Sequence, residues 1–365
     1  MLDFDTANQM FKDDQIRELS STSEGMRFLK LRSLSRKDQM QYLIESSNID
    51  VGDTKSKVWL KTLYESDVET SSIDNVIANL YEKEREVRRQ HESQLVSELY
   101  KVQSFQWGGL HQNSLEKTIV DNYVKRITSF DILNFAIEND LHNSMRAYVL
   151  ASWYNHWSSI VIEDVFKEHE KVIPAVGLVK KIDFFVNDKP FDLKVTYLPE
   201  GYVRDSRKEQ GLKPELTLLK SMARRLKIAF DKEVADSVLV PDLWRKLDDS
   251  PSDSASELIA SLQKNRETLL KECMEKPEHL VRWLYENQGV RRFDASNRLF
   301  LVLVDKGDFF ESWKLKRARQ LIADSVSSYL DKIEQDMGFE LEFHWEGKTY
   351  TTESAAIFVV KDSKT

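Results

Sequence analysis

The stretch from residue 180 to residue 195 constrains the fold of this chain more than any other, because two short apolar runs flank an Asn-Asp pair. It reads KKIDFFVNDKPFDLKV. Successive side chains of a strand point to opposite faces, and asparagine and aspartate tolerate the backbone angles of tight turns. The pattern predicts two antiparallel strands joined by a turn at Asn187 and Asp188.

The length of that turn decides which charged side chains share a face. A two-residue turn places Asp183 directly opposite Asp192, with Cβ atoms roughly 4.5–5.5 Å apart. A four-residue turn places Asp183 opposite Lys194 on the same face, whereas an odd-length turn or a bulge separates the two acids. Asp192 and Lys194 share a face because they are two residues apart. Two facing carboxylates repel each other, and a divalent cation would convert that repulsion into binding energy.

Composition describes an ordinary globular protein. The chain has 365 residues, of which 41% are hydrophobic and 31% are charged, and its net charge is −8. That charge argues against nonspecific coating of a polyanion but allows a local basic cleft. The single Cys273 permits no internal disulfide and no cysteine-rich zinc site. No apolar run approaches the roughly 18–20 residues that span a bilayer, and the acidic N-terminal stretch does not resemble a signal peptide. We expect a cytoplasmic protein.

Periodicity predicts helices up to about residue 140, and the long aromatic stretch 144–171 predicts a buried helix. Three strands then follow within residues 171–198. A polar loop leads to a helix that begins near Pro214, and residues 236–296 form a mostly helical insertion. The apolar run 297–305 predicts a buried strand, before one more helix and two late strands. We expect two domains, namely a helical region at 1–140 for DNA recognition or dimerisation and a catalytic domain at 141–365.

This order of elements, with Asp183 on the second strand and Asp192-Leu193-Lys194 on the third, resembles the PD-(D/E)XK nuclease superfamily. The resemblance covers residues 144–305 and is most specific at 163–194. It implies an α-β-β-β-α-β core, that is, an α/β (α+β) fold with a central mixed sheet flanked by helices. Asp183 matches the first motif acid, Asp192 and Lys194 match the second acid and the lysine, and Glu163 matches an acid that many members carry on the preceding helix.

Two positions depart from the family pattern. Ile182 precedes the first acid where the motif name has proline. The helix acid is also ambiguous, because three further acids lie close to Glu163 in the sequence. These are Asp164, Glu168 and Glu170.

The resemblance implies a magnesium-dependent endodeoxyribonuclease, most similar to a type II restriction endonuclease. Mg²⁺ prefers oxygen ligands and usually takes one or two carboxylates plus water and phosphate oxygens. Asp183, Asp192 and Glu163 would supply those carboxylates. Lys194 would orient the attacking water or offset developing charge. Such an enzyme would act on double-stranded DNA as a homodimer, because two cuts need two sites, and a companion DNA methyltransferase would be encoded nearby.

An acid-x-lysine triplet by itself is a weak signal. The chain carries others at 53–55, 346–348 and 362–364, but these fall in a loop-like stretch, a turn and the tail. The competing interpretation of Asp192 and Lys194 is a solvated strand face with a mild ion pair. For Glu163 the competing interpretation is a surface acid.

A basic stretch follows the third strand. Residues 199–233 contain nine basic and six acidic side chains, and this local surplus suits an edge that contacts phosphates. A solvated helix face explains it equally well. The residues expected to contact DNA are Arg204, Arg207, Lys208, Lys213, Arg224 and Arg225.

Other functions remain open. A repair, recombination or transposase-like nuclease would use the same core, and a helical DNA-binding or interaction protein with a decayed nuclease core would use none of its chemistry. The sequence contains no G-x-x-x-x-G-K-[ST], G-x-G-x-x-G or G-x-S-x-G motif, which disfavours nucleotide-driven motors and serine hydrolases of the nucleophile-elbow type.

Overall fold

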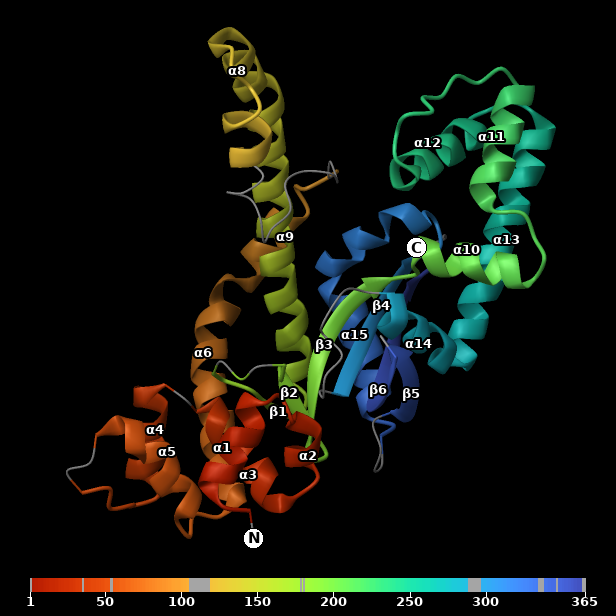
Figure 1. Cartoon of the computed structure of the whole chain (residues 1–365). Coiled ribbons are helices and arrows are strands. Elements are labelled where there is room, and N and C mark those ends of the chain that lie inside the picture. The colour runs from red at the N-terminus through yellow and green to blue at the C-terminus, as the bar shows by residue number, and fades with distance from the viewer. Residues whose placement is uncertain are drawn as a thin grey trace. The chain divides into compact units, whose positions relative to one another are not determined.

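The computed structural model forms two compact units. The first, the sheet unit, comprises Met1–Glu82, Phe166–Leu315 and Gln320–Thr365, and the second, the helical unit, comprises Lys83–Val165 and Lys316–Arg319. Figure 1 shows the elements of both along the chain. The structure describes residues 2–34, 36–52, 55–104, 119–177, 179, 181–287, 297–333, 338–345 and 347–362, without the side chains of Lys57 and Trp345.

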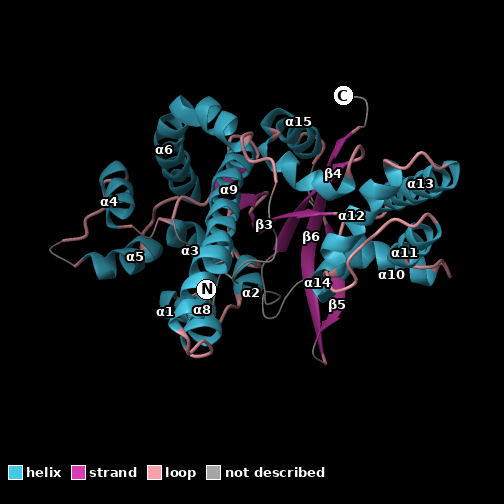
Figure 2. Cartoon of the chain, turned by 90° about the horizontal axis from the view of Figure 1, so that it is seen from above, coloured by secondary structure: helices cyan, strands magenta, loops and turns pink. Residues whose placement is uncertain are grey.

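The sheet unit is built on a six-stranded mixed sheet with the order β1-β2-β3-β4-β6-β5. Figure 2 shows its strands in magenta. The first three strands are antiparallel neighbours, β4 is parallel to β3 and to β6, and β5 is antiparallel to β6. The fold is therefore mixed α/β, as the sequence predicted. The strands are β1 (Val172–Pro174), β2 (Phe184–Val186), β3 (Lys189–Tyr197), β4 (Asn297–Asp305), β5 (Phe339–Trp345) and β6 (Lys348–Lys361).

The central strand β4 has the bounds that the sequence predicted. All of its residues except Asp305 are buried, which explains its nearly continuous apolar sequence, since a parallel strand in the middle of a sheet is covered on both faces. Helix α14 (Pro277–Asn287) packs Leu284 and Tyr285 into the same core cluster as Phe300 and Phe343 of the sheet.

The N-terminal helices share a core with the first strands. Val176, Ile182 and Phe185 belong to one buried cluster with residues of α1 to α6. The shared core therefore groups the N-terminal helices with the first strands, whereas the sequence suggested a domain boundary at residue 140. The helices are α1 (Phe4–Lys12), α2 (Ile16–Ser20), α3 (Ser23–Ser33), α4 (Lys37–Ser46), α5 (Ser56–Glu65) and α6 (Thr70–Leu99), the last of which continues into the helical unit.

The segment after β3 is more helical than expected. Residues 200–209 form helix α10 (Glu200–Glu209), where the sequence suggested a polar loop with two glycines. Its Val203 is buried, and its Glu200 binds Arg266 at 2.7 Å. Arg266 also binds Glu215 at 2.6 Å, so a buried cation from a distant helix fixes the start of α10. The sequence of 200–209 gives no sign of this long-range partner.

The expected insertion is helical in its described part, and its last residues, 288–296, lie outside the described residues. Its helices are α12 (Asp236–Asp248), α13 (Asp253–Glu275) and α14, and they follow α11 (Glu215–Arg225), the helix that was expected to begin near Pro214. The serine-rich sequence of residues 248–257 suggests a loop, but α13 already begins at Asp253, so the loop is shorter. The helix predicted after β4 is divided into a 3₁₀ segment η4 (Phe309–Arg317) and helix α15 (Arg319–Leu330).

The helical unit consists of the second part of α6, the π-helical segment η2 (Val120–Val124), α8 (Phe130–Ala136), the π-helical segment η3 (Ile137–Leu141) and most of α9 (His142–Lys167). Arg88 of α6 binds Asp164 of α9 through two hydrogen bonds of 2.7 and 2.9 Å. The sequence suggests a turn at Gly108-Gly109 and a helix that begins near Ser114, and both positions lie outside the described residues. Among the helices described, none combines the length and the apolar character that crossing a bilayer requires.

Candidate functional site

The hairpin of β2 and β3 has the two-residue turn that the sequence favoured. Val186 pairs with Lys189, and both turn residues adopt left-handed backbone angles, with φ of 48° at Asn187 and 56° at Asp188. Asparagine and aspartate visit this region at lower cost than other residues with a side chain, which explains the Asn-Asp pair. The register continues from Phe184 opposite Phe191.

Asp183 lies at the point where the ladder between the two strands ends. Its backbone N–H donates to the carbonyl of Phe191 at 2.9 Å, and its carboxylate Oδ2 accepts from the backbone N–H of Leu193 at 2.7 Å. The Asp183 carboxylate thus accepts from the N–H of Leu193, just beyond Phe184 and Phe191, the last backbone pair of the two strands. This contact holds the Asp183 carboxylate against the residue between Asp192 and Lys194.

Asp192 is buried between two cations. Its Oδ1 accepts from Nζ of Lys194 at 2.5 Å, and its Oδ2 lies 3.5 Å from Nε of Arg298. Arg298 pairs with Asp192 in the register of β3 and β4. The side chain of Lys194 is 33% exposed and that of Arg298 is 6% exposed. Lys194 therefore faces solvent more than Arg298, which is the interior counterion.

Arg298 is the site residue that the sequence analysis missed. Its guanidinium lies 5.0 Å from the ring centroid of Tyr285, and the Tyr285 hydroxyl lies 2.9 Å from Oγ of Ser354. Burial raises the pKa of Tyr285, and the neighbouring Arg298 opposes this rise. A signal was present, because an arginine at the start of an apolar strand needs a partner when it is buried.

The charges of Asp183, Asp192, Lys194 and Arg298 balance one another. Asp183 and Asp192 contribute two negative charges, and Lys194 and Arg298 contribute two positive ones. Carboxylate oxygens are ligands that Mg²⁺ prefers, and one or two of them suffice for a typical site. Asp183 and Asp192 therefore fit that ion by chemistry, although a metal at Asp192 would compete with Lys194. Within the described residues no group of three or more His, Cys, Asp or Glu side chains has the arrangement of a metal site.

Glu163 lies on α9 within the helical unit, where its side chain is partly buried. Its neighbour Asp164 is buried and binds Arg88, with Arg85 at 3.8 Å. Asp164 is thus a structural anion of the helical unit. Glu168 and Glu170 are exposed. The participation of Glu163 in the site remains a prediction.

The expected DNA-contacting residues divide into two groups. Arg207 is buried, and it donates to the carbonyl of Lys213 at 2.9 Å and to Asn265 at 2.5 Å. It holds the loop after α10 in place, so its guanidinium is not exposed as a DNA contact would require. The other members are exposed. These are Arg204, Lys208, Lys213, Arg224 and Arg225.

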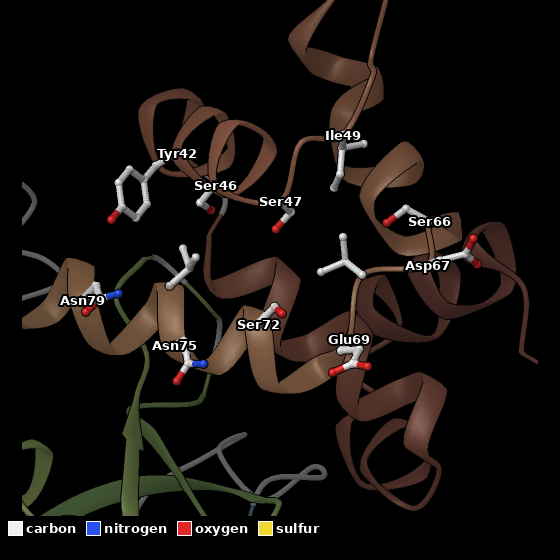
Figure 3. Close-up of a pocket in the computed structure, with 12 residues that line it drawn as sticks. Tyr42, Ser46, Ser47, Ile49, Ser66, Asp67, Glu69, Ser72, Asn75 and Asn79 are labelled. Atoms are coloured by element: carbon white, nitrogen blue, oxygen red, sulfur yellow. The ribbon is translucent and has the colours of Figure 1, made fainter.

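A pocket of about 700 Å³ opens among α4, α6 and the segment that joins α5 to α6. Figure 3 shows Ser46 and Ser47 facing Ser72 and Asn75 across it. Its lining contains hydroxyls, amides and the carboxylates of Asp67 and Glu69 but no lysine or arginine. Because a phosphate ligand needs positive charge, we do not assign this pocket to the DNA backbone.

Comparisons with protein-family models, with curated proteins and with solved structures found no match to this chain.

Proposed function

We propose that this chain is a magnesium-dependent endonuclease that hydrolyses phosphodiester bonds of double-stranded DNA. One observation carries the proposal, namely that the side chains of Asp183, Asp192 and Lys194 meet at residues 192–194 of β3. Lys194 binds Asp192, and Asp183 binds the backbone of Leu193 between them. Two carboxylates and one lysine at the end of a hairpin are the side chains that the PD-(D/E)XK motif combines.

The order of elements supports the same proposal. Helix α9 precedes β1, β2 and β3, and then come α10, the helical insertion, β4 and α15. This is the order helix, three strands, helix and strand that the resemblance implied. The antiparallel hairpin and the parallel β3–β4 pair bring the motif residues next to Arg298, which lies about 100 residues further along the chain.

The residues present suit hydrolysis of an anionic ester. When bound, Mg²⁺ would polarise a phosphoryl oxygen and lower the pKa of water. Asp183 and Asp192 would hold that ion. Lys194 would orient the attacking water once it no longer binds Asp192. A bound cation would add positive charge beside Lys194 and Arg298, which suits an anionic phosphodiester.

Within this activity we propose a type II restriction enzyme of the cytoplasm that acts as a homodimer and has a companion DNA methyltransferase. Five exposed basic side chains on α10, on α11 and between them would contact phosphates of the DNA. These are Arg204, Lys208, Lys213, Arg224 and Arg225. Recombination and repair nucleases on the same core would share the hairpin site.

A second candidate function is a non-catalytic DNA-binding or interaction protein, and one observation favours it. Asp192 already has two cationic partners, Lys194 and Arg298. A buried charge that is paired in this way can have a structural role in the sheet without any catalytic role. The two functions make opposite predictions for metal-dependent DNA cleavage.

Cleavage of supercoiled plasmid DNA with Mg²⁺ or Mn²⁺ tests the proposal. We expect nicked or linear products from the wild type, and none after chelation of the metal. Asp192→Asn abolishes cleavage because it removes a metal ligand. Lys194→Ala lowers the rate by roughly 10²–10⁴-fold, as is typical when a positioned acid–base group is lost.

A matched pair elsewhere in the chain provides the control. Lys246 binds Asp242 at 2.8 Å on the exposed side of α12, so Asp242→Asn and Lys246→Ala remove the same kinds of charge at a distant ion pair. Both variants should cleave like the wild type. If the wild type cleaves neither DNA nor RNA with either metal, the nuclease proposal is wrong. A fixed fragment pattern would support restriction rather than repair.

A further inference from the structure

A cavity of about 420 Å³ lies between α10, α13 and α14, all within the sheet unit. We call it the three-helix pocket, and its size falls within the range of roughly 300–1,000 Å³ that is usual for small-molecule sites. Its lining residues recur at intervals of three or four along each helix, so that each helix turns one face toward it. The candidate site at the β2–β3 hairpin uses none of these side chains. The aromatic and acidic residues of the pocket are Tyr202, Asp205, Glu209, Glu272, Glu275 and Trp283.

Two aromatic rings line the pocket as a fixed pair. The ring centroids of Tyr202 and Trp283 lie 5.9 Å apart, and the ring planes meet at 71°. The indole N–H of Trp283 donates to Oδ2 of Asp205 at 3.0 Å, and this hydrogen bond lowers the pKa of Asp205. A Cβ atom at Gly201 would lie 2.7 Å from Cζ2 of Trp283, so the indole packs directly on the backbone of α10. Trp283 is therefore held in place beside an ionised carboxylate.

The charge of the pocket lining favours an organic cation. Four carboxylates, two from α10 and two from α13, line the pocket together with one lysine, Lys276, and with His279. Over the described residues, neither Glu209 nor Glu272 has an ion-pair partner. Such a lining attracts cations and repels phosphates. A metal ion suits it poorly, because the described His, Cys, Asp and Glu side chains form no group that could hold one. Aromatic faces instead attract ammonium groups within about 6 Å of the ring centroid.

We propose that the three-helix pocket binds a linear polyamine. The ammonium groups of such a ligand pair with carboxylates from both helices, and one of them lies over Trp283, since tryptophan is the ring that binds cations most strongly. The methylene chains between the ammonium groups contact the two rings and Leu269, which also lines the pocket. A ligand with several positive charges fits better than a single ammonium ion, because the carboxylates come from two helices. This inference does not depend on the proposed nuclease activity.

Calorimetric titration of the full chain with spermidine tests the pocket. We expect saturable binding of one spermidine by each wild-type chain. The double variant Glu209→Gln/Glu272→Gln should weaken this binding roughly 5–10-fold, because it removes two charges that would pair with the ligand. Glu233→Gln/Glu257→Gln is the matched control, since both acids are exposed and lie outside the pocket. The control should bind like the wild type. Equal weakening by the two double variants would indicate diffuse attraction to an acidic protein and would overturn the proposal.

The fluorescence of Trp283 provides a second measurement. The chain has eight tryptophans, so the difference between the wild type and Trp283→Phe isolates the signal of this residue. Spermidine should change that signal, whereas MgCl₂ at the same ionic strength should not. The same change with Mg²⁺ would assign the pocket to a metal ion. Tetralysine carries the same ammonium groups on a peptide, and tighter binding of tetralysine than of spermidine would assign the pocket to a lysine-rich segment. Either result, or no saturable binding of spermidine, would overturn the proposal.

Discussion

At the scale of single residues, the candidate site depends on the two cations that pair with the buried Asp192. A buried carboxylate is stable only when it is paired. Arg298 supplies an interior counterion 3.5 Å away, and Lys194 supplies a second, more exposed one at 2.5 Å. This arrangement separates two roles. Arg298 can stabilise Asp192 permanently, whereas Lys194 can leave it and still face solvent.

The first consequence concerns stability. Arg298→Met removes a buried cation that pairs with Asp192 and stacks on Tyr285. Removal of one partner from a buried pair typically costs about 3–5 kcal/mol. Because Lys194 remains as a second partner of Asp192, the loss should lie at the lower end of this range. We expect the free energy of unfolding in urea to fall by about 3 kcal/mol. Arg204→Met, on an exposed side chain, should change it by less than about 0.5 kcal/mol. Equal effects of the two substitutions would contradict this assignment.

The sequence predicted the residues of the hairpin but not their interior partner. Alternation along a strand placed Asp192 and Lys194 together. Asp183 lies beyond the last backbone pair, Phe184 with Phe191, and reaches β3 through its carboxylate, which accepts from the N–H of Leu193. Arg298 reaches Asp192 through the parallel pairing of β3 and β4, which are separated by the whole helical insertion. No local pattern encodes that register. Arg207 was misjudged for a similar reason, because its buried position depends on Asn265 of α13.

At the scale of elements, the β2–β3 turn positions the site. Its two non-glycine residues have positive φ, and the Asp188 carboxylate binds the buried Lys30 at 2.7 Å. Lys30 also binds Asp74 of α6 at 2.9 Å. The turn is thus attached to the N-terminal helices, so that these helices help to fix the register on which Asp183 and Asp192 depend.

A substitution at Asn187 tests the role of the turn. Valine is β-branched and disfavours left-handed backbone angles, which cost ordinary residues about 1–2 kcal/mol. We therefore expect Asn187→Val to lower the free energy of unfolding by roughly 1 kcal/mol. Asn187→Gly should lower it less than Asn187→Val does, because glycine adopts positive φ freely. Denaturant titration measures both, and equal losses would show that another interaction of Asn187 matters more than its backbone conformation.

The elements themselves could be predicted to different degrees. Strand β4 was predicted to the residue because buried parallel strands are continuously apolar, and the Asn-Asp pair located the hairpin turn. Helix α10 was missed because its glycine and its many charges resemble a loop, while Glu200 is fixed by Arg266 from α13. The division of the predicted late helix into η4 and α15 was also missed. Nothing in its periodicity marks the change from 3₁₀ to α geometry.

At the scale of the whole molecule, the two units contain different candidate residues. The sheet unit contains Asp183, Asp192, Lys194 and Arg298, whereas the helical unit contains Glu163. The two hairpin carboxylates and both of their cations therefore belong to one compact unit.

We propose that Asp192 exchanges Lys194 for a metal ion, and Mn²⁺ binding, measured by the electron paramagnetic resonance of the free ion, distinguishes this exchange from a permanent ion pair. Because Lys194 competes for the same carboxylate, Lys194→Met should tighten Mn²⁺ binding several-fold even though it impairs cleavage. Asp192→Ala should abolish that binding, and Asp242→Asn should leave it unchanged. Mn²⁺ affinity that is indifferent to both Lys194→Met and Asp192→Ala would contradict the account and favour a purely structural ion pair.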